Sequence, residues 1–465
     1  MASVALAPTE LGTEKIGKLL KMYAVPGIIA QTAASLYNMV DSIYIGHIPG
    51  VGSAAISGLA VTFPLMNLAT AMGTLVGVGA TTLISVLLGQ KNYDTARKVL
   101  SNVLSLNLII GALFSGVTLA FLDPILRFFG ASDVTLPFAR DYMLIILVGN
   151  VFTHLYFGFN GLIRASGHPK TAMGLTLFTV ISNAVLDPVF IFVFEMGIRG
   201  AALATVICQM AALVYTMKFF LDKKNLLHFP KPMFQIDWRI AGQSLAIGLG
   251  PFLMNSAACL VALFINQQLG KYGGDLAIGA YGIVNRLTML FIMVCMGFNQ
   301  GLQPIAGYNY GARQYHRVKE VFVLTAKWEI LVTSLCFLMA ELIPGLAVSL
   351  FTNDPEMIRM ASKALRIMCA GTALVGFGIT TSTFFQCLGM VSKSIFLSLS
   401  RQLIFLLPLI YSLPMWFQEK GVWMSFPIAD MLSVVVSLVF VLRLFKKFDK
   451  LKDGQDAGAL GSAIK

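Results

Sequence analysis

Long apolar runs recur along the whole chain, and they restrict the fold more than any other feature of the sequence. A helix needs about 20 mostly apolar residues to cross a bilayer. Twelve runs meet that length, with rough limits 19–45, 54–88, 100–122, 137–163, 172–194, 199–221, 240–268, 276–305, 320–343, 358–386, 394–416 and 422–445. Charged residues make up only 12% of the chain, about half the fraction usual in a soluble protein. The sequence therefore predicts an all-α polytopic membrane protein, because its pattern differs from the alternation of an outer-membrane barrel.

The positions of the basic residues explain the net charge of +12. The connections after the even-numbered runs, with the adjoining helix ends, hold Lys91, Arg97, Lys98, Arg164, Lys170, Lys223, Lys224, Lys231, Arg239, Arg313, Arg317, Lys319, Lys393, Arg443, Lys446, Lys447 and Lys450. The connections on the opposite side hold fewer. Positively charged connections stay in the cytoplasm, so we expect both termini there. The surrounding partner is then a lipid bilayer, and nucleic-acid binding is not expected.

The chain divides into two halves of six runs each. Gly89 to Gly167 in the first half and Gly311 to Gly389 in the second are both 78 positions apart (167 − 89 and 389 − 311). An even number of helices per half gives both halves one orientation, which is the parallel-repeat plan of many transporters. We predict five parts: a cytoplasmic N-terminal segment 1–18, an N-lobe 19–221, a cytoplasmic linker 222–239, a C-lobe 240–445 and a cytoplasmic tail 446–465.

The repeat also reveals a difference between the halves. Pro26 to Asp41 and Pro251 to Asn266 are both 15 positions apart, so an acid in the first half corresponds to an amide in the second. Asp187 corresponds to a leucine in the same way. The acids of the first and fifth runs therefore belong to the N-terminal half only.

Two of the apolar runs place an acid and an amide on one helix face. Tyr37 and Asn38 precede Asp41 by four and three residues, and Asn183 precedes Asp187 by four. Residues at these spacings are neighbours on a helix surface. A charged group facing lipid costs several kcal/mol, so both acids should face protein or a cavity.

Proline and threonine residues add to this cluster. Pro188 cannot donate to the carbonyl of Ala184, so we expect the fifth helix to bend and to free a backbone oxygen. Thr205 in the sixth run offers a hydroxyl, and Pro26 is a second candidate bend. Carboxylates, an amide, a hydroxyl and a carbonyl suit Na⁺, whereas the same acids could instead carry protons. A buried network that only holds helices together is the alternative, and residue types do not decide among the three.

Other polar groups within the runs are open to two interpretations. Asp430 is either a second functional acid or a lobe-stabilising partner, and Glu329 is interpreted as an interfacial pair with Lys327. The amides Asn160, Asn255, Gln267, Asn299, Gln300 and Gln303 either line a cavity or bridge helices. The methionines of the eighth run, Met289, Met293 and Met296, either line an adaptable pocket or pack in the core.

Several motifs of other protein classes do not occur. The sequence holds no G-x-x-x-x-G-K-[ST] loop, no G-x-S-x-G, no H-E-x-x-H and no cofactor fingerprint. Its six cysteines form no Cys-x-x-Cys pair, and its five histidines show no metal-ligand spacing. We therefore predict that the protein is not an enzyme, has no cofactor, and uses an ion gradient if its transport is active.

The sequence resembles the multidrug and toxic compound extrusion (MATE) family, and most of all its bacterial MepA- and DinF-like members. The resemblance rests on "LGQKN" after the second run, "NGLIRASGHPK" after the fourth, "NAVLDPVFIF" in the fifth, "GIRGAALAT" leading into the sixth and "GFNQGLQPIAGYNYGA" ending the eighth. It implies two six-helix bundles in a V shape, in a bacterial cytoplasmic (inner) membrane. It also implies export of cationic or amphipathic drugs in exchange for H⁺ or Na⁺, by alternating access.

The resemblance also implies an ion-coupling site in the N-lobe. Its members are Tyr37, Asp41, Asn160, Asn183, Asp187 and Thr205, with Na⁺ a candidate ligand of Asp41, Asn183, Asp187 and Thr205. The predicted substrate cavity comprises Gln31, Tyr37, Asn38, Met289, Met293, Asn299 and Gln300. A NorM-like branch of the family uses acids in the seventh and tenth runs, which this chain lacks. We expect a monomer, and the alternatives are a lipid-linked precursor flippase of related fold or an ion channel.

Overall fold

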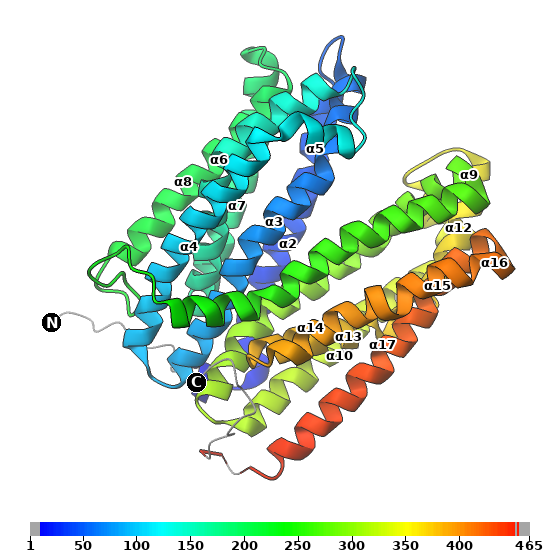
Figure 1. Ribbon diagram of the computed structural model, residues 1–465. Helices are drawn as coiled ribbons and strands as arrows, with labels where there is room; N and C mark the ends of the chain where they lie inside the picture. Colours follow the sequence, from blue (N-terminus) through cyan, green and yellow to red (C-terminus); the bar gives the residue numbers. More distant parts are fainter. Residues whose placement is uncertain (1–9, 452, 455–465) are drawn as a thin grey trace. The chain divides into compact units, whose positions relative to one another are not determined.

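The first half of the chain folds into long helices that follow the predicted runs (Figure 1). The computed structural model describes residues 10–451 and 453–454. The first elements are α1 (Glu10–Thr13), α2 (Ile16–Gly46), α3 (Gly52–Gly89), α4 (Tyr93–Ala120), α5 (Leu122–Phe128), α6 (Leu136–Ala165), α7 (Pro169–Pro188), the π-helix η1 (Val189–Val193) and α8 (Ile198–Leu221). Each of the first six predicted runs corresponds to one of these long helices, with α7 and η1 together forming the fifth.

The second half follows the same plan with more interruptions. Its elements are α9 (Trp238–Gly311), α10 (Tyr315–Leu342), α11 (Pro344–Ser349), α12 (Pro355–Cys369), the 3₁₀-helix η2 (Thr372–Leu374), α13 (Val375–Cys387), α14 (Val391–Leu399), the π-helix η3 (Ser400–Leu406), α15 (Leu407–Ser412), α16 (Pro414–Phe417) and α17 (Glu419–Phe448). The backbone of α9 breaks at Gly274, where φ is 67°. Only glycine combines this φ with the ψ of −168° found here without strain, and the break separates the seventh and eighth runs.

The described helices account for the twelve predicted runs. Among the described residues, ten helices are long and apolar enough to cross a membrane, or eleven if one bent pair is counted as a single span. The bent pair, α12 with η2 and α13, turns by 48° and corresponds to the tenth run. With α2, which covers the first run, the total is twelve. The predicted all-α polytopic fold class is confirmed, whereas the break in the tenth run was not predicted.

Contacts divide the described chain into two compact units. Unit 1 comprises residues 10–13 and 29–252, and unit 2 comprises 14–28, 253–451 and 453–454. The first part of α2 therefore belongs to unit 2, and the first part of α9 belongs to unit 1. The predicted lobes 19–221 and 240–445 stay a prediction.

Two glycines allow the first part of α9 to pack in unit 1 and the first part of α2 to pack in unit 2. In unit 1, a Cβ on Gly248 of α9 would lie 1.7 Å from the Leu75 carbonyl oxygen of α3. In unit 2, a Cβ on Gly297 would lie 2.5 Å from the Cα of Ile28 in α2. Backbones approach this closely only where a side chain is missing, which is how small residues pack membrane helices. Close backbone packing at a glycine therefore occurs in both units.

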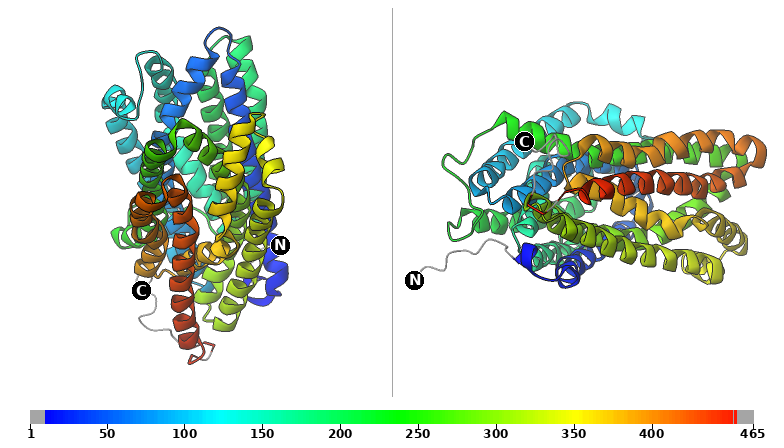
Figure 2. Two further views of the ribbon diagram at one scale, coloured as in Figure 1. Left: turned by 90° about the vertical axis from the view of Figure 1, so that its right-hand side faces the viewer. Right: turned by 90° about the horizontal axis from the view of Figure 1, so that it is seen from below.

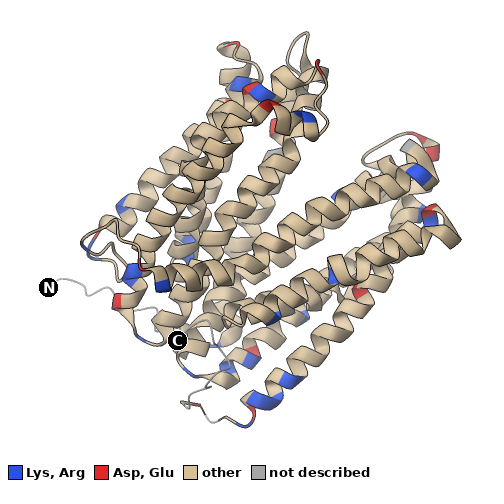
Figure 3. Cartoon of the chain, in the orientation of Figure 1, with Lys and Arg blue, Asp and Glu red and all other residues tan. Residues whose placement is uncertain are grey.

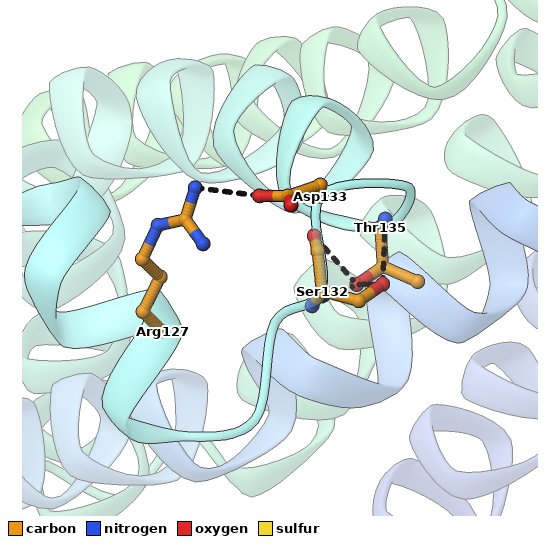
Figure 4. A network of polar contacts seen from close by, with 4 residues as sticks. All are labelled: Arg127, Ser132, Asp133 and Thr135. Atoms are coloured by element: carbon orange, nitrogen blue, oxygen red, sulfur yellow. Dashed lines mark hydrogen bonds and ion pairs between the residues drawn. The ribbon is translucent and has the colours of Figure 1, made fainter.

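The helical middles are largely apolar and the charges gather near helix ends. Figure 3 shows Lys, Arg, Asp and Glu mostly near the ends of the long helices, and Figure 2 shows the same helices from two further sides. The α5–α6 connection is one such end (Figure 4). There Arg127 donates to Asp133 at 2.8 Å, and the backbone N–H groups of Ser132 and Thr135 each donate to the other residue's hydroxyl. Exposed polar groups of this kind fit the ends of membrane helices rather than their centres.

Candidate functional site

A cluster of polar side chains from three helices lies inside unit 1. Asn183 Nδ2 donates to Asp187 Oδ1 at 2.6 Å, one turn apart on α7. The Thr205 hydroxyl of α8 lies 3.1 Å from Asn183 Oδ1 and donates to it. Tyr37 Oη of α2 lies 3.1 Å from Thr205 Oγ1. Because the single Thr205 proton is directed to Asn183 or to the Ala201 carbonyl, Tyr37 is the donor to Thr205. The chain of bonds connects α2, α8 and α7 in that order.

The two acids of this cluster are buried and close to each other. Asp41 is 6% exposed and Asp187 is 0% exposed. Their carboxyl groups are close enough to interact directly. Among the described residues, Asp41 Oδ1 and Asp187 Oδ2 have no hydrogen-bond partner. Two buried carboxyl groups in contact can both be ionised only if a cation lies between them. Without a cation, they must share a proton.

The local sequence explains how α7 presents Asp187. Pro188 ends the regular part of α7, and the chain continues as the π-helix η1. A proline removes one backbone donor and crowds the preceding turn, and a widened turn relieves that crowding. The Phe194 N–H accordingly reaches back five residues to the Val189 carbonyl at 2.9 Å. A π turn thus follows Pro188 directly. Among the described residues, the one helix pair bent by more than 40° is α12 with α13, and the bend predicted at Pro188 stays a prediction.

Asn160 lies outside this hydrogen-bonded chain. Its Nδ2 contacts Tyr156 Oη and the Ala172 carbonyl at 3.2 Å, and Thr176 Oγ1 at 3.3 Å. Thr176 precedes Asn183 by seven residues on α7, or about 10 Å at 1.5 Å per residue. The structure therefore assigns Asn160 to a second network that joins α6 to α7.

Tyr142 of α6 is a member of the cluster that the sequence analysis missed. It is 3% exposed, and its phenol lies within electrostatic range of both Asp41 and Asp187. A tyrosine in an apolar helix is common, so its identity gave no signal. The pattern of α6 could have shown it, because Tyr142 lies on a buried face with Ala139 and Ile146.

The predicted substrate-cavity residues fall in both units. Gln31 and Tyr37, in unit 1, are partly buried, and Asn38 lies in α2 with a side chain outside the described residues. Met289, which is 42% exposed, and the partly buried Met293 lie in the second part of α9 in unit 2. The buried Asn299 and the partly buried Gln300 belong to the same stretch, and a Cβ on Gly27 of α2 would lie 3.3 Å from Gln300 Cβ. Their shared role stays a prediction.

Asp430 has a charged partner in unit 2. Arg401 Nε donates to Asp430 Oδ1 at 2.5 Å, and the two side chains are 36% and 3% exposed. Arg401 belongs to η3, so this pair joins the π turn to α17. Of the two predicted roles, the contact matches that of a stabilising partner.

The interpretation of Glu329 as an interfacial partner of Lys327 is wrong. Glu329 is 0% exposed, whereas Lys327 is exposed, and no ion pair joins them among the described residues. Two residues apart on a helix, they point about 200° away from each other, because each residue advances the helix by about 100°.

Pro26 lies buried within the continuous helix α2.

The fold and its buried acids define a multi-pass helical membrane protein with ionisable groups inside its spans. A comparison with family models matches the MatE family over residues 26–189 and 251–412. The multidrug export protein MepA of Staphylococcus aureus (strain MSSA476) is 28% identical over 427 residues, which cover 92% of this chain and 94% of that protein.

Solved structures agree with this result. The MATE multidrug transporter DinF-BH is 35% identical, with a TM-score of 0.86, over 95% of this chain and 98% of that one. A MATE in the bent conformation, 23% identical, shares the fold with a TM-score of 0.90 over 96% of this chain and 99% of that one. The chain belongs to the MatE family, the MATE transporters.

Proposed function

We propose that the protein is a secondary active antiporter that exports cationic or amphipathic compounds in exchange for H⁺ or Na⁺. The observation that carries this proposal is the buried contact between Asp41 and Asp187 in unit 1. Two touching acids within membrane spans can exchange a bound positive charge, which an energy-coupled transporter needs. The names of similar proteins, a multidrug export protein and a multidrug transporter, support drugs as the cargo.

The donor set fits either ion. Asp41 Oδ1 and Asp187 Oδ2 are buried oxygens without a partner among the described residues, and Thr205 Oγ1 and Tyr37 Oη lie in the same cluster. Oxygen ligands of this kind suit Na⁺, as hard cations prefer them. A proton shared by the two carboxyl groups neutralises them equally well. The coupling ion is therefore assigned by experiment rather than by residue type.

In the proposed coupling, the ion and the drug bind preferentially to two different conformations of unit 1. Ion binding to the acid pair neutralises Asp187, which changes the charge at the start of the π turn η1 and favours one arrangement of unit 1. A drug that prefers the other arrangement then competes with the ion even if the two never touch. Asn183 and Thr205 position Asp187 and transmit its charge state to α8.

We also propose a setting for the transporter. We place it in a bacterial cytoplasmic membrane as a monomer, with both termini in the cytoplasm as the basic connections indicate. We expect no cofactor beyond the coupling ion.

The test is ethidium transport by the purified full chain in proteoliposomes. Wild type is compared with Asp41→Asn under an imposed pH gradient and then under an imposed Na⁺ gradient. We expect one gradient to drive dye movement in wild type, and Asp41→Asn to bind dye without gradient-driven movement. Dye movement by wild type that neither gradient changes would contradict antiport, and would favour a channel or an ion-independent flippase.

A further inference from the structure

Unit 2 contains a buried carboxyl group with no ion-pair partner. Glu329 of α10 is 0% exposed, and neither of its carboxyl oxygens has a hydrogen-bond partner of standard geometry among the described residues. Lys327 points away from it, and Asp430, the other buried acid among the described residues of unit 2, is held by Arg401. An ionised carboxylate without compensation is among the most costly groups to bury. Its charge must therefore be neutralised by something that these helices do not supply.

The second part of α9 brings polar groups to this acid. The Cys295 side chain lies within electrostatic range of Glu329. Three residues further on, the Phe298 ring stacks on Trp328 with centroids 6.2 Å apart, so this stretch contacts α10 directly. Asn299, one turn after Cys295, is 7% exposed, and its Oδ1 and Nδ2 have no partner among the described residues.

Helix α13 approaches the same acid from another side. A Cβ on Gly376 would lie 2.6 Å from the Glu329 carbonyl carbon, so the two backbones are in close contact. One turn later, the Thr380 hydroxyl lies beside the Glu329 carboxyl group. Its single proton is donated to the Gly376 carbonyl at 2.9 Å. The Thr380 oxygen is therefore available as an acceptor on the side of the acid.

A second hydroxyl lies one turn before Glu329 on α10. Thr325 is 0% exposed, and its Oγ1 has no partner among the described residues. The short connection 312–314 makes α10 run antiparallel to the second part of α9. One turn forward from Cys295 on α9 is therefore level with one turn back from Glu329 on α10, which places Asn299 and Thr325 at the same depth.

The composition of this cluster determines which ions suit it. It contains one carboxyl group, one amide and two hydroxyls, with Cys295 of α9 as the other titratable group facing Glu329 and none on the facing part of α13. No set of three His, Cys, Asp or Glu residues able to hold a metal occurs in the part of the chain that the structure describes. A single negative charge among neutral oxygens matches one positive charge.

We propose that Glu329, Asn299, Thr325 and Thr380 form a second site for a monovalent cation, H⁺ or Na⁺, inside unit 2. The buried carboxyl group supplies the charge, and the amide and hydroxyl oxygens supply the neutral ligands. The site is distinct from the acid pair in unit 1, because all four residues belong to unit 2.

Trp328 gives a direct readout of this site, since it is adjacent to Glu329 and stacks on α9. The full chain in lipid nanodiscs is titrated with NaCl at constant ionic strength against KCl, at several pH values, and tryptophan fluorescence is recorded. The signal of a Trp328→Phe variant is subtracted to remove the contribution of the other tryptophans. We expect a saturable response to Na⁺, or to pH alone if the occupant is a proton. If both ions bind, the apparent Na⁺ affinity falls by up to about tenfold for each unit by which the pH is lowered, because protons compete for the same carboxylate.

Matched variants decide whether Glu329 is responsible. Glu329→Gln should lose the response, whereas Glu320→Gln, the same change at an exposed position of α10, should keep it. Asp41→Asn should also keep it, which separates this site from the one in unit 1 and from transport itself. A wild-type chain that responds to neither ion, or a Glu329→Gln variant that responds like wild type, would overturn the proposal. If Glu329→Gln fails to fold, Thr325→Val serves instead, and an unchanged response in that variant counts against the site.

Discussion

In unit 1 two carboxyl groups, Asp41 and Asp187, lie in contact and have no basic partner among the described residues, whereas in unit 2 Asp430 is held by Arg401 at 2.5 Å. Both units contain a π turn beside their acid, η1 after Asp187 and η3 around Arg401. In both units a glycine, Gly248 or Gly297, also lets two helices from different sequence repeats pack in close backbone contact. The units therefore share a way of packing, whereas the Asp41–Asp187 pair and Asp430 differ in how their charge is neutralised. A fixed guanidinium holds Asp430 in one state, while an exchangeable ion can leave Asp41 and Asp187.

The largest effect should come from removing one exchangeable acid. Asp187→Asn keeps the volume and most hydrogen bonds but removes the charge that the coupling ion neutralises. We expect gradient-driven ethidium transport to fall to the background of empty liposomes, while dye binding is kept. Asp430→Asn is the matched control in unit 2 and should retain gradient-driven transport. Equal loss in both variants would remove the distinction between the two units.

The shared packing device can be tested by filling a glycine. Gly248→Ala places a methyl group 1.7 Å from the Leu75 carbonyl oxygen, so α9 must move away from α3. We expect a loss of about 3 kcal/mol or more in stability, by analogy with severe overpacking, seen as a lower unfolding temperature in detergent. Gly242→Ala, on the same helix with open space around its Cα, should be neutral or slightly stabilising. A stable Gly248→Ala variant would show that this close contact does not hold unit 1 together.

Breaking the ion pair of unit 2 should have a smaller effect. Arg401→Met leaves Asp430 buried without a partner. Fully buried pairs cost about 3–5 kcal/mol to break in this way, and the 36% exposure of Arg401 reduces our expectation to about 2 kcal/mol. The double variant Arg401→Met with Asp430→Leu should recover most of that loss in thermal unfolding. No recovery in the double variant would mean that the pair does more than neutralise charge.

The smallest effect should come from the hydroxyl at the edge of the acid pair. Thr205→Val removes the bond to Asn183 Oδ1 at 3.1 Å and keeps the side-chain shape. A hydrogen bond of this kind is worth about 1 kcal/mol, so we expect coupling-ion affinity to fall about fivefold. The ion concentration for half-maximal transport measures this change. Thr216→Val, whose hydroxyl bonds its own helix at the Leu213 carbonyl, is the control. Equal shifts in the two variants would show that the effect is general to α8.

The sequence predicted the helices and the acid cluster well for a physical reason. Membrane spans are defined by apolar length, and the four-residue spacings of Tyr37 with Asp41 and of Asn183 with Asp187 fix which side chains share a face. Contacts between helices are not contained in such spacings. Tyr142 and the separate network of Asn160 depend on how α6 packs, and the sequence alone does not give that packing.

The burial of Glu329 could have been predicted from the helical spacing of the residues around it. Its neighbour in sequence, Lys327, suggested an ion pair at the interface. The buried residues of α10 instead follow helical spacing through Val318, Phe322, Thr325, Glu329 and Thr333. That phase places Glu329 on the packed face and Lys327 off it. The break in the tenth run had a weaker signal, because glycines such as Gly371 occur in many unbroken membrane helices.

Coupling between drug and ion at the Asp41–Asp187 pair is tested most directly by counting the ions released when a drug binds. Purified protein in lightly buffered solution, with a pH indicator or a Na⁺-sensitive dye, receives ethidium while wild type and Asp41→Asn are compared. Wild type should release H⁺ or Na⁺ as ethidium binds, and Asp41→Asn should bind ethidium without releasing either ion. The reciprocity of binding requires this link if the acid pair couples ion to drug. Ethidium binding that releases no ion from wild type, or the same release from both proteins, would contradict it.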